Sequence, residues 1–112
     1  MQDLNISSTF FDEIKNDCGV TWDNEKTNNR INGIINNAID EFKEWFGNDI
    51  DVEKYGNIRK MFMAYVRYHY YDQGEDFKRN YASDILNERM KYEVNEYEKS
   101  KANLSWWVYI FS

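Results

Sequence analysis

The stretch INGIINNAIDEFKEWF, residues 31–46, decides the fold. Its apolar residues recur every three or four positions, which is the period of an α-helix and not the period of two that a strand shows. These residues are Ile31, Ile34, Ile35, Ala38, Ile39, Phe42, Trp45 and Phe46. We predict a helix over about 24–46 that ends at Gly47-Asn48. It is about 33 Å long, at ~1.5 Å per residue.

A short helix is predicted on the N-terminal side, over residues 8–18. Ser8 or Thr9 supplies a hydroxyl that can cap the free N–H groups of its first turn. Gly19 follows at the position where a helix often ends on a left-handed residue. The apolar face of this helix consists of Phe10, Phe11, Ile14 and Cys18.

Two longer helices are predicted on the C-terminal side. The third covers about 51–72, with Asp49 or Asp51 as its cap and with Gly56 inside it. Its apolar face consists of Val52, Tyr55, Ile58, Phe62, Tyr65, Val66 and His69. DQGED breaks the pattern, and the fourth helix runs over about 75–99. The fourth helix carries Phe77, Tyr81, Ile85, Leu86, Met90, Tyr92 and Val94.

The end of the chain, LSWWVYIFS, residues 104–112, differs from everything before it. An unbroken aromatic and β-branched run suits an extended arm or a short strand, so we expect such an arm over 103–112. The fold class is therefore all-α: one domain over 1–112, with one short helix, three longer helices and this arm. The candidate protein-interface residues are Trp106, Trp107, Val108, Tyr109, Ile110 and Phe111. Either the chain's own bundle or a partner must cover them.

Composition limits the classes of partner. The chain has 20 acidic and 14 basic residues and a formal net charge of -6. This balance disfavours binding to the phosphates of nucleic acid, which depends on Lys and Arg. Cys18 is the single cysteine, so no internal disulfide forms and a reducing compartment is expected. Because no apolar run approaches the ~20 residues that cross a bilayer, we expect no membrane partner.

Residues for chemistry are few. His69 lies three residues before Asp72 and could supply half of a metal site, but a lone histidine among tyrosines is more often a packed ring. Cys18 reads as a buried thiol and not as a nucleophile. AYVRYHYYDQ, residues 64–73, offers rings for base stacking without an evident positive groove. We expect no enzyme, no cofactor and no metal.

The order of these pieces is similar to that of a known family. VTWD precedes the long helix, which closes at WFG, and AYVRYHYYDQ leads into FKRNYASDILNERMKYEV. This layout resembles the head–tail connector, or adaptor, proteins of long-tailed double-stranded DNA bacteriophages, particularly those that infect Gram-positive hosts. The likeness covers about residues 8–94 and does not include the aromatic arm.

The resemblance implies a structural role in the virion. Such proteins form a ring, usually twelvefold, that binds the portal protein, extends the DNA channel and offers a platform to the tail or to a stopper connector. Double-stranded DNA passes through without specific binding, and the expected location is the virion neck, after assembly in the host cytoplasm. The alternative is an acidic helical protein that mimics DNA and inhibits a nucleic-acid-binding partner, which the clusters WDNEKTNN and DQGED would suit.

Overall fold

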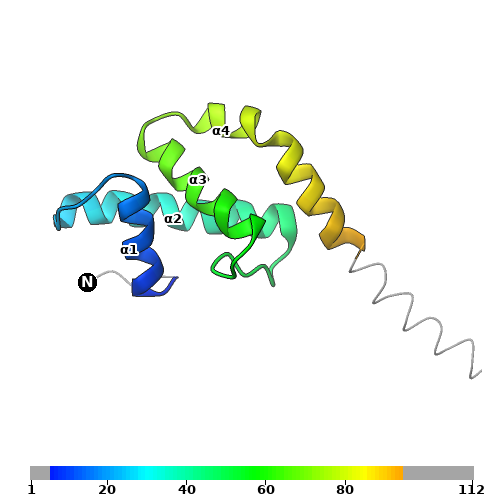
Figure 1. The fold of residues 1–112 in the computed structure, drawn as a ribbon, viewed down its shortest axis with the longest axis horizontal. Coiled ribbons are helices and arrows are strands. Elements are labelled where there is room, and N and C mark those ends of the chain that lie inside the picture. Colours follow the sequence, from blue (N-terminus) through cyan, green and yellow to red (C-terminus); the bar gives the residue numbers. More distant parts are fainter. Residues whose placement is uncertain (1–5, 95–112) are drawn as a thin grey trace, which may run out of the picture.

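The computed structural model describes residues 6–94, and no strand occurs among them (Figure 1). The labelled helices are α1 (Ser8–Asp17), α2 (Glu25–Phe46), α3 (Asn57–Tyr70) and α4 (Gly74–Asn80), and a further helix covers 82–94. The predicted all-α class is confirmed. The predicted arm over 103–112 lies outside the described residues.

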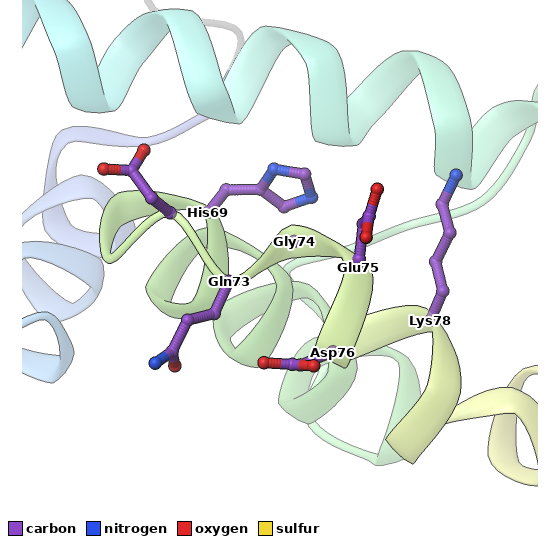
Figure 2. Close-up of a pocket in the computed structure, with 7 residues that line it drawn as sticks. His69, Gln73, Gly74, Glu75, Asp76 and Lys78 are labelled. Atoms are coloured by element: carbon purple, nitrogen blue, oxygen red, sulfur yellow. The ribbon is translucent and has the colours of Figure 1, made fainter.

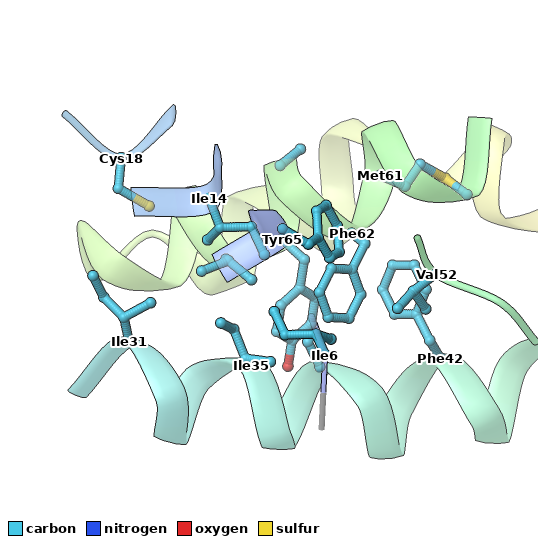
Figure 3. Packing of buried hydrophobic residues seen from close by; sticks show 14 of the residues in the cluster. Ile6, Ile14, Cys18, Ile31, Ile35, Phe42, Val52, Met61, Phe62 and Tyr65 are labelled. Carbon is cyan, nitrogen blue, oxygen red and sulfur yellow. The ribbon is translucent and has the colours of Figure 1, made fainter. Parts of the chain in front are cut away.

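The core lies where α1 and α3 pack across α2 (Figure 3). Phe62 of α3 is its centre, with ring centroids 5.8 Å from Phe10 of α1 and 5.3 Å from Phe42 of α2. Phe42 also meets Tyr65 edge to face at 6.0 Å. Each fully buried ring of this kind contributes roughly 1.5–3 kcal/mol of transfer free energy, so this cluster dominates the cohesion of the bundle.

The ends of α1 follow standard capping chemistry. The N-cap is Ser7 and not the predicted Ser8 or Thr9, since the Ser7 hydroxyl accepts a backbone N–H of the first turn at 3.2 Å. At the other end Gly19 has φ 81, and the N–H groups of Gly19 and Val20 bond back to the last turn at 3.0 and 2.9 Å. These two bonds form a Schellman motif, as the glycine led us to expect.

The third helix begins later than predicted. Its expected range was 51–72, but Gly56 is the N-cap of α3, with φ 145, and no side chain caps that end. Asp49 and Asp51 therefore do not cap it, and Gly56 is not inside it. The Asp51 carboxylate instead accepts the N–H two residues further on, at 3.0 Å, which closes a local turn. Tyr55, expected on the buried face, is 83% exposed.

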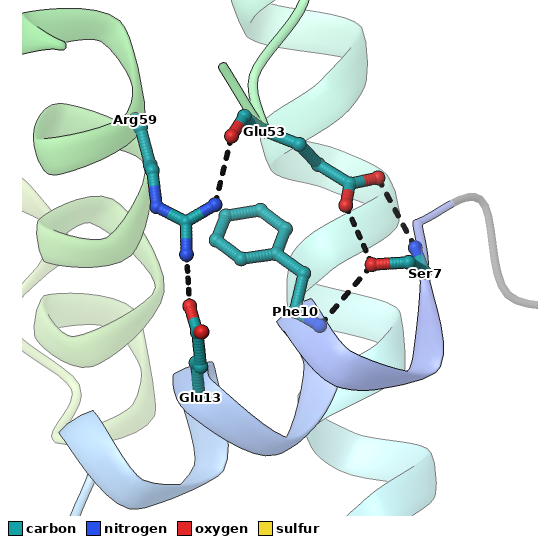
Figure 4. Close-up of polar contacts among 5 residues, drawn as sticks. All are labelled: Ser7, Phe10, Glu13, Glu53 and Arg59. Atoms are coloured by element: carbon teal, nitrogen blue, oxygen red, sulfur yellow. Dashed lines mark hydrogen bonds and ion pairs between the residues drawn. The ribbon is translucent and has the colours of Figure 1, made fainter. Parts of the chain in front are cut away.

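A tertiary network explains the late start of α3 (Figure 4). The Glu53 carboxylate accepts the hydroxyl of Ser7 at 2.6 Å and its backbone N–H at 3.1 Å. Arg59 donates to the Glu53 carbonyl at 2.8 Å and pairs with Glu13, while its guanidinium lies 4.4 Å from the Phe10 ring centroid. These contacts bind the segment before α3 to α1, and helical geometry there would break them.

The predicted fourth helix, 75–99, is divided at Tyr81. Here the backbone takes φ -109 and ψ 10, between α4 and the 82–94 helix. The Tyr81 ring stacks on Phe77 at 4.8 Å and meets Tyr68 edge to face at 6.0 Å. The ring thus stays on the bundle while the chain changes direction. Residues 95–99 of the prediction lie outside the described range.

Candidate interaction surface

One face of the 82–94 helix is attached to the bundle. Ile85 packs against the core, and the Glu88 carboxylate accepts the Asn57 side-chain amide at 3.0 Å. This hydrogen bond is the main reason that the pKa of Glu88 is lowered. The Tyr92 ring lies directly over Gly47, where no Cβ would fit. The helix is therefore tied to the end of α2 and the start of α3.

The opposite face of the same helix is apolar and exposed. Leu86, Met90 and Val94 are 57%, 54% and 53% exposed, and we call these three residues the outer stripe. Their spacing of four places them along one side of the helix, and at 100° per residue that side points away from Ile85 and Tyr92. The helix thus carries two apolar faces, and the bundle covers one of them.

The outer stripe is unlike the other exposed apolar groups in the range 6–94. The large apolar side chains that are more than half exposed there also include Trp22, Tyr55 and Tyr71. Each of these three side chains makes a hydrogen bond or a cation–π contact. The Trp22 indole N–H donates to a threonine hydroxyl at 3.4 Å, Tyr55 lies on a guanidinium, and the Tyr71 hydroxyl donates to the Cys18 carbonyl at 2.6 Å. The three side chains of the outer stripe have no such polar contact within that range, and they form a continuous apolar row along one helix.

The aromatic residues predicted as the interface, 106–111, lie outside the described range. In the sequence they follow the outer stripe, with eleven residues, 95–105, between Val94 and Trp106. The outer stripe itself was not singled out by the sequence prediction. A helical projection of 81–94 would have separated Leu86, Met90 and Val94 from Ile85 and Tyr92.

His69, the candidate metal ligand, lies in an open hollow of about 510 Å³ beside α2 (Figure 2). Its ring stacks on Tyr65 at 4.1 Å, and the Tyr65 hydroxyl is hydrogen-bonded to Glu41, which also lies 3.6 Å from the Lys78 amine. Burial lowers the pKa of His69, against the opposing charge of Glu41. Gly74 at the start of α4 makes room for the imidazole, since a Cβ there would collide with it.

Asp72, the second candidate ligand of the proposed metal site, is paired with a cation. Asp72 forms an ion pair with Arg30 at 3.6 Å. Within residues 6–94 no group of three or more His, Cys, Asp or Glu side chains is placed to hold a metal ion. The observed contacts of the His69 ring are its stacking on Tyr65 and its close approach to Gly74.

Cys18 is buried in the core, and the arginines beside the tyrosine-rich segment 64–73 are engaged in contacts within the chain. Cys18 is buried, and burial followed by the charge of Asp17 raises its pKa to about 11, so the thiol is protonated at neutral pH. Arg67 pairs with Asp17 at 2.7 Å, and Arg30 donates to the Tyr70 carbonyl at 2.6 Å. These two cations are therefore engaged by groups of the fold itself.

Two further findings concern the potential of the chain to span a membrane and its similarity to known proteins. No helix between residues 6 and 94 is long and apolar enough to cross a membrane. Comparison of the chain with protein-family models, curated proteins and solved structures finds no match.

Proposed function

We propose that this chain is a structural subunit of a phage neck, a head–tail connector that acts through protein interfaces. In this role it joins a ring on the portal protein, extends the DNA channel and supports the tail or a stopper connector. The observation that carries the proposal is the outer stripe, an aliphatic face on a helix that leads toward the aromatic residues 106–111. Exposed apolar patches of this kind mark protein–protein contact sites.

The energetics suit repeated assembly. A ring needs two unlike patches per subunit, because each head-to-tail contact joins different surfaces. The outer stripe is one patch and residues 106–111 offer another. Aromatic side chains bury about 150–250 Å² each, so at ~25 cal/mol per Å² their burial is worth several kcal/mol per subunit. A contact of that size is multiplied around a closed ring.

The charge suits a channel for DNA. The formal net charge is -6, and several cations of the described part are held in ion pairs. A net-negative wall repels phosphate and does not retain a moving duplex.

The ion pairs also separate this proposal from the DNA-mimic alternative. A mimic needs rows of unpaired acids on one face, in the pattern of duplex phosphates. Glu13, Asp17 and Glu41 are instead paired with Arg59, Arg67 and Lys78, respectively. This pairing favours the connector.

The test is co-purification with virions and with the portal protein encoded in the same genome. We expect the wild-type chain at the neck of purified particles and in a complex with the portal. Met90→Lys places a charge in the outer stripe and should lower incorporation, whereas Lys91→Arg, one residue away on another side of the helix, should not. Absence from the particle, or substrate turnover by the isolated chain, would contradict the proposal.

A further inference from the structure

We propose that, in the free subunit, residues 106–111 fold back and lie on the outer stripe of the same chain. The starting point is the two-faced 82–94 helix, whose inner side is fixed by Asn57–Glu88 and by Tyr92 on Gly47. The outer side presents Leu86, Met90 and Val94, each of which is more than half exposed.

The chain has the length to make this contact. The outer stripe runs for about 12 Å, at ~1.5 Å per helical residue. Residues 106–111 span about 17 Å when extended, at ~3.3 Å per residue, so the segment is long enough to cover the whole stripe. Residues 95–105 connect them, which at the same rise reach up to about 35 Å. That is more than a reversal of direction at the end of the helix requires.

The outer stripe is too small to bind its own copy. A stable interface buries about 800 Å² on each partner, and three partly exposed aliphatic side chains offer far less. Stripe-to-stripe pairing of two chains would therefore be weak. The aromatic segment supplies the missing area through Trp106, Trp107, Tyr109 and Phe111, each of which buries about 150–250 Å².

Tethering favours the segment of the same chain over that of a second copy. A short linker holds its segment at an effective concentration of the order of 1 mM, far above that of free subunits at micromolar concentration. In a ring the neighbouring segment reaches a comparable local concentration, and the contact can pass from one chain to the next. That exchange rests on the proposed function, whereas the intramolecular contact does not.

The test is disulfide trapping in the full-length chain at low micromolar concentration. Met90→Cys in the outer stripe is combined with Val108→Cys, and separately with Tyr109→Cys, because neighbouring residues of an extended segment point to opposite sides. Lys91→Cys is the matched control, one residue along and about 100° around the helix. Cys18 is buried and does not compete. We expect the intramolecular disulfide, which gives a closed monomer, to form roughly tenfold faster when Met90→Cys is one partner than when Lys91→Cys is.

Every outcome of the trapping experiment either supports or overturns the proposed intramolecular contact. A disulfide-linked dimer whose yield rises with concentration would identify a second copy as the occupant and overturn the proposal. Equal rates at positions 90 and 91, or no closed monomer, would overturn it as well. A second measurement uses acrylamide quenching of Trp106 and Trp107 with Trp22→Phe and Trp45→Phe in place. Quenching should increase with Met90→Lys and stay unchanged with Lys91→Arg. Because these measurements use the free chain, their failure is distinct from failure to bind the portal.

Discussion

α2 and the 82–94 helix carry apolar residues at similar spacing but differ in what covers them. In α2, Ile31, Ile35 and Phe42 are all fully buried. In the later helix, Leu86 and Met90 are more than half exposed, although Ile85 beside them packs on the core. Periodicity therefore identifies a helix and its apolar sides, while cover depends on which elements the chain brings against each side.

The largest effect should come from Phe42→Ala in the covered helix. Phe42 contacts the rings of Phe62, Tyr65 and Phe46, and its removal leaves a cavity among aromatic groups. We expect the free energy of unfolding to fall by about 3–5 kcal/mol, measured by urea denaturation. A loss below about 1 kcal/mol would show that α2 is not the covered side of this comparison.

Gly47→Ala tests the joint between the two helices. Gly47 has φ 98, and an added Cβ would overlap the Tyr92 ring, so backbone strain and a clash combine. We expect a loss of about 2 kcal/mol. Gly33→Ala is the matched control, because nothing lies within 4 Å of its Cβ position inside α2. That change should stabilise the protein by roughly 0.5–1 kcal/mol, and destabilisation by both variants to the same extent would contradict the assignment of the joint.

A smaller effect is expected from pH at His69, which lies between α2 and α4. Burial holds its folded pKa below the ordinary 6.5, with Lys78 adding to the shift and Glu41 opposing it. The unfolded chain therefore takes the proton first as pH falls, and this group lowers stability below about pH 6.5. His69→Phe keeps a ring on Tyr65 and removes the proton site. Urea unfolding from about pH 8 to 5 should show a shallower acid loss in the variant, by less than one bound proton. An identical slope in the two proteins would refute the shift.

The smallest effect is expected from Leu86→Ala in the outer stripe. Since the bundle leaves more than half of Leu86 exposed, truncation opens no cavity in the core. The loss is limited to part of the proposed contact with residues 106–111, so the cost should be about 1 kcal/mol in unfolding free energy. Urea denaturation beside Phe42→Ala gives the comparison directly. A cost equal to that of Phe42→Ala would show that both apolar faces belong to the core.

Sequence patterns predicted local features better than tertiary ones. α2 was predicted to within one residue, because Asn24 caps it and its apolar row is long. The start of α3 was placed too early, because the spacing of Val52 and Tyr55 also suits a helix. What prevents that helix is the pairing of Glu53 with Ser7, which is 46 residues away and leaves no local pattern.

The candidate surface was predicted only in part. The aromatic residues 106–111 stand out in the sequence and remain a prediction. The prediction merged the outer stripe with Ile85 and Tyr92 into one apolar set, although a helical projection separates the two sides. Which side the bundle covers could not be predicted, because the direction of the helix after Tyr81 depends on ring packing against Phe77 and Tyr68.

Because the chain leaves helical geometry at Tyr81, a change in the backbone there would rotate the 82–94 helix as a rigid unit about that residue. Thirteen residues at ~1.5 Å each give an arm of about 20 Å, so a rotation of about 30° at Tyr81 carries its far end through an arc of about 10 Å. The angle is set by three anchors, which are the packing of Ile85 on the core, the Asn57–Glu88 hydrogen bond and the seat of Tyr92 on Gly47. Substitutions at these anchors would re-aim the carboxyl-terminal end without redesigning the bundle that supports it.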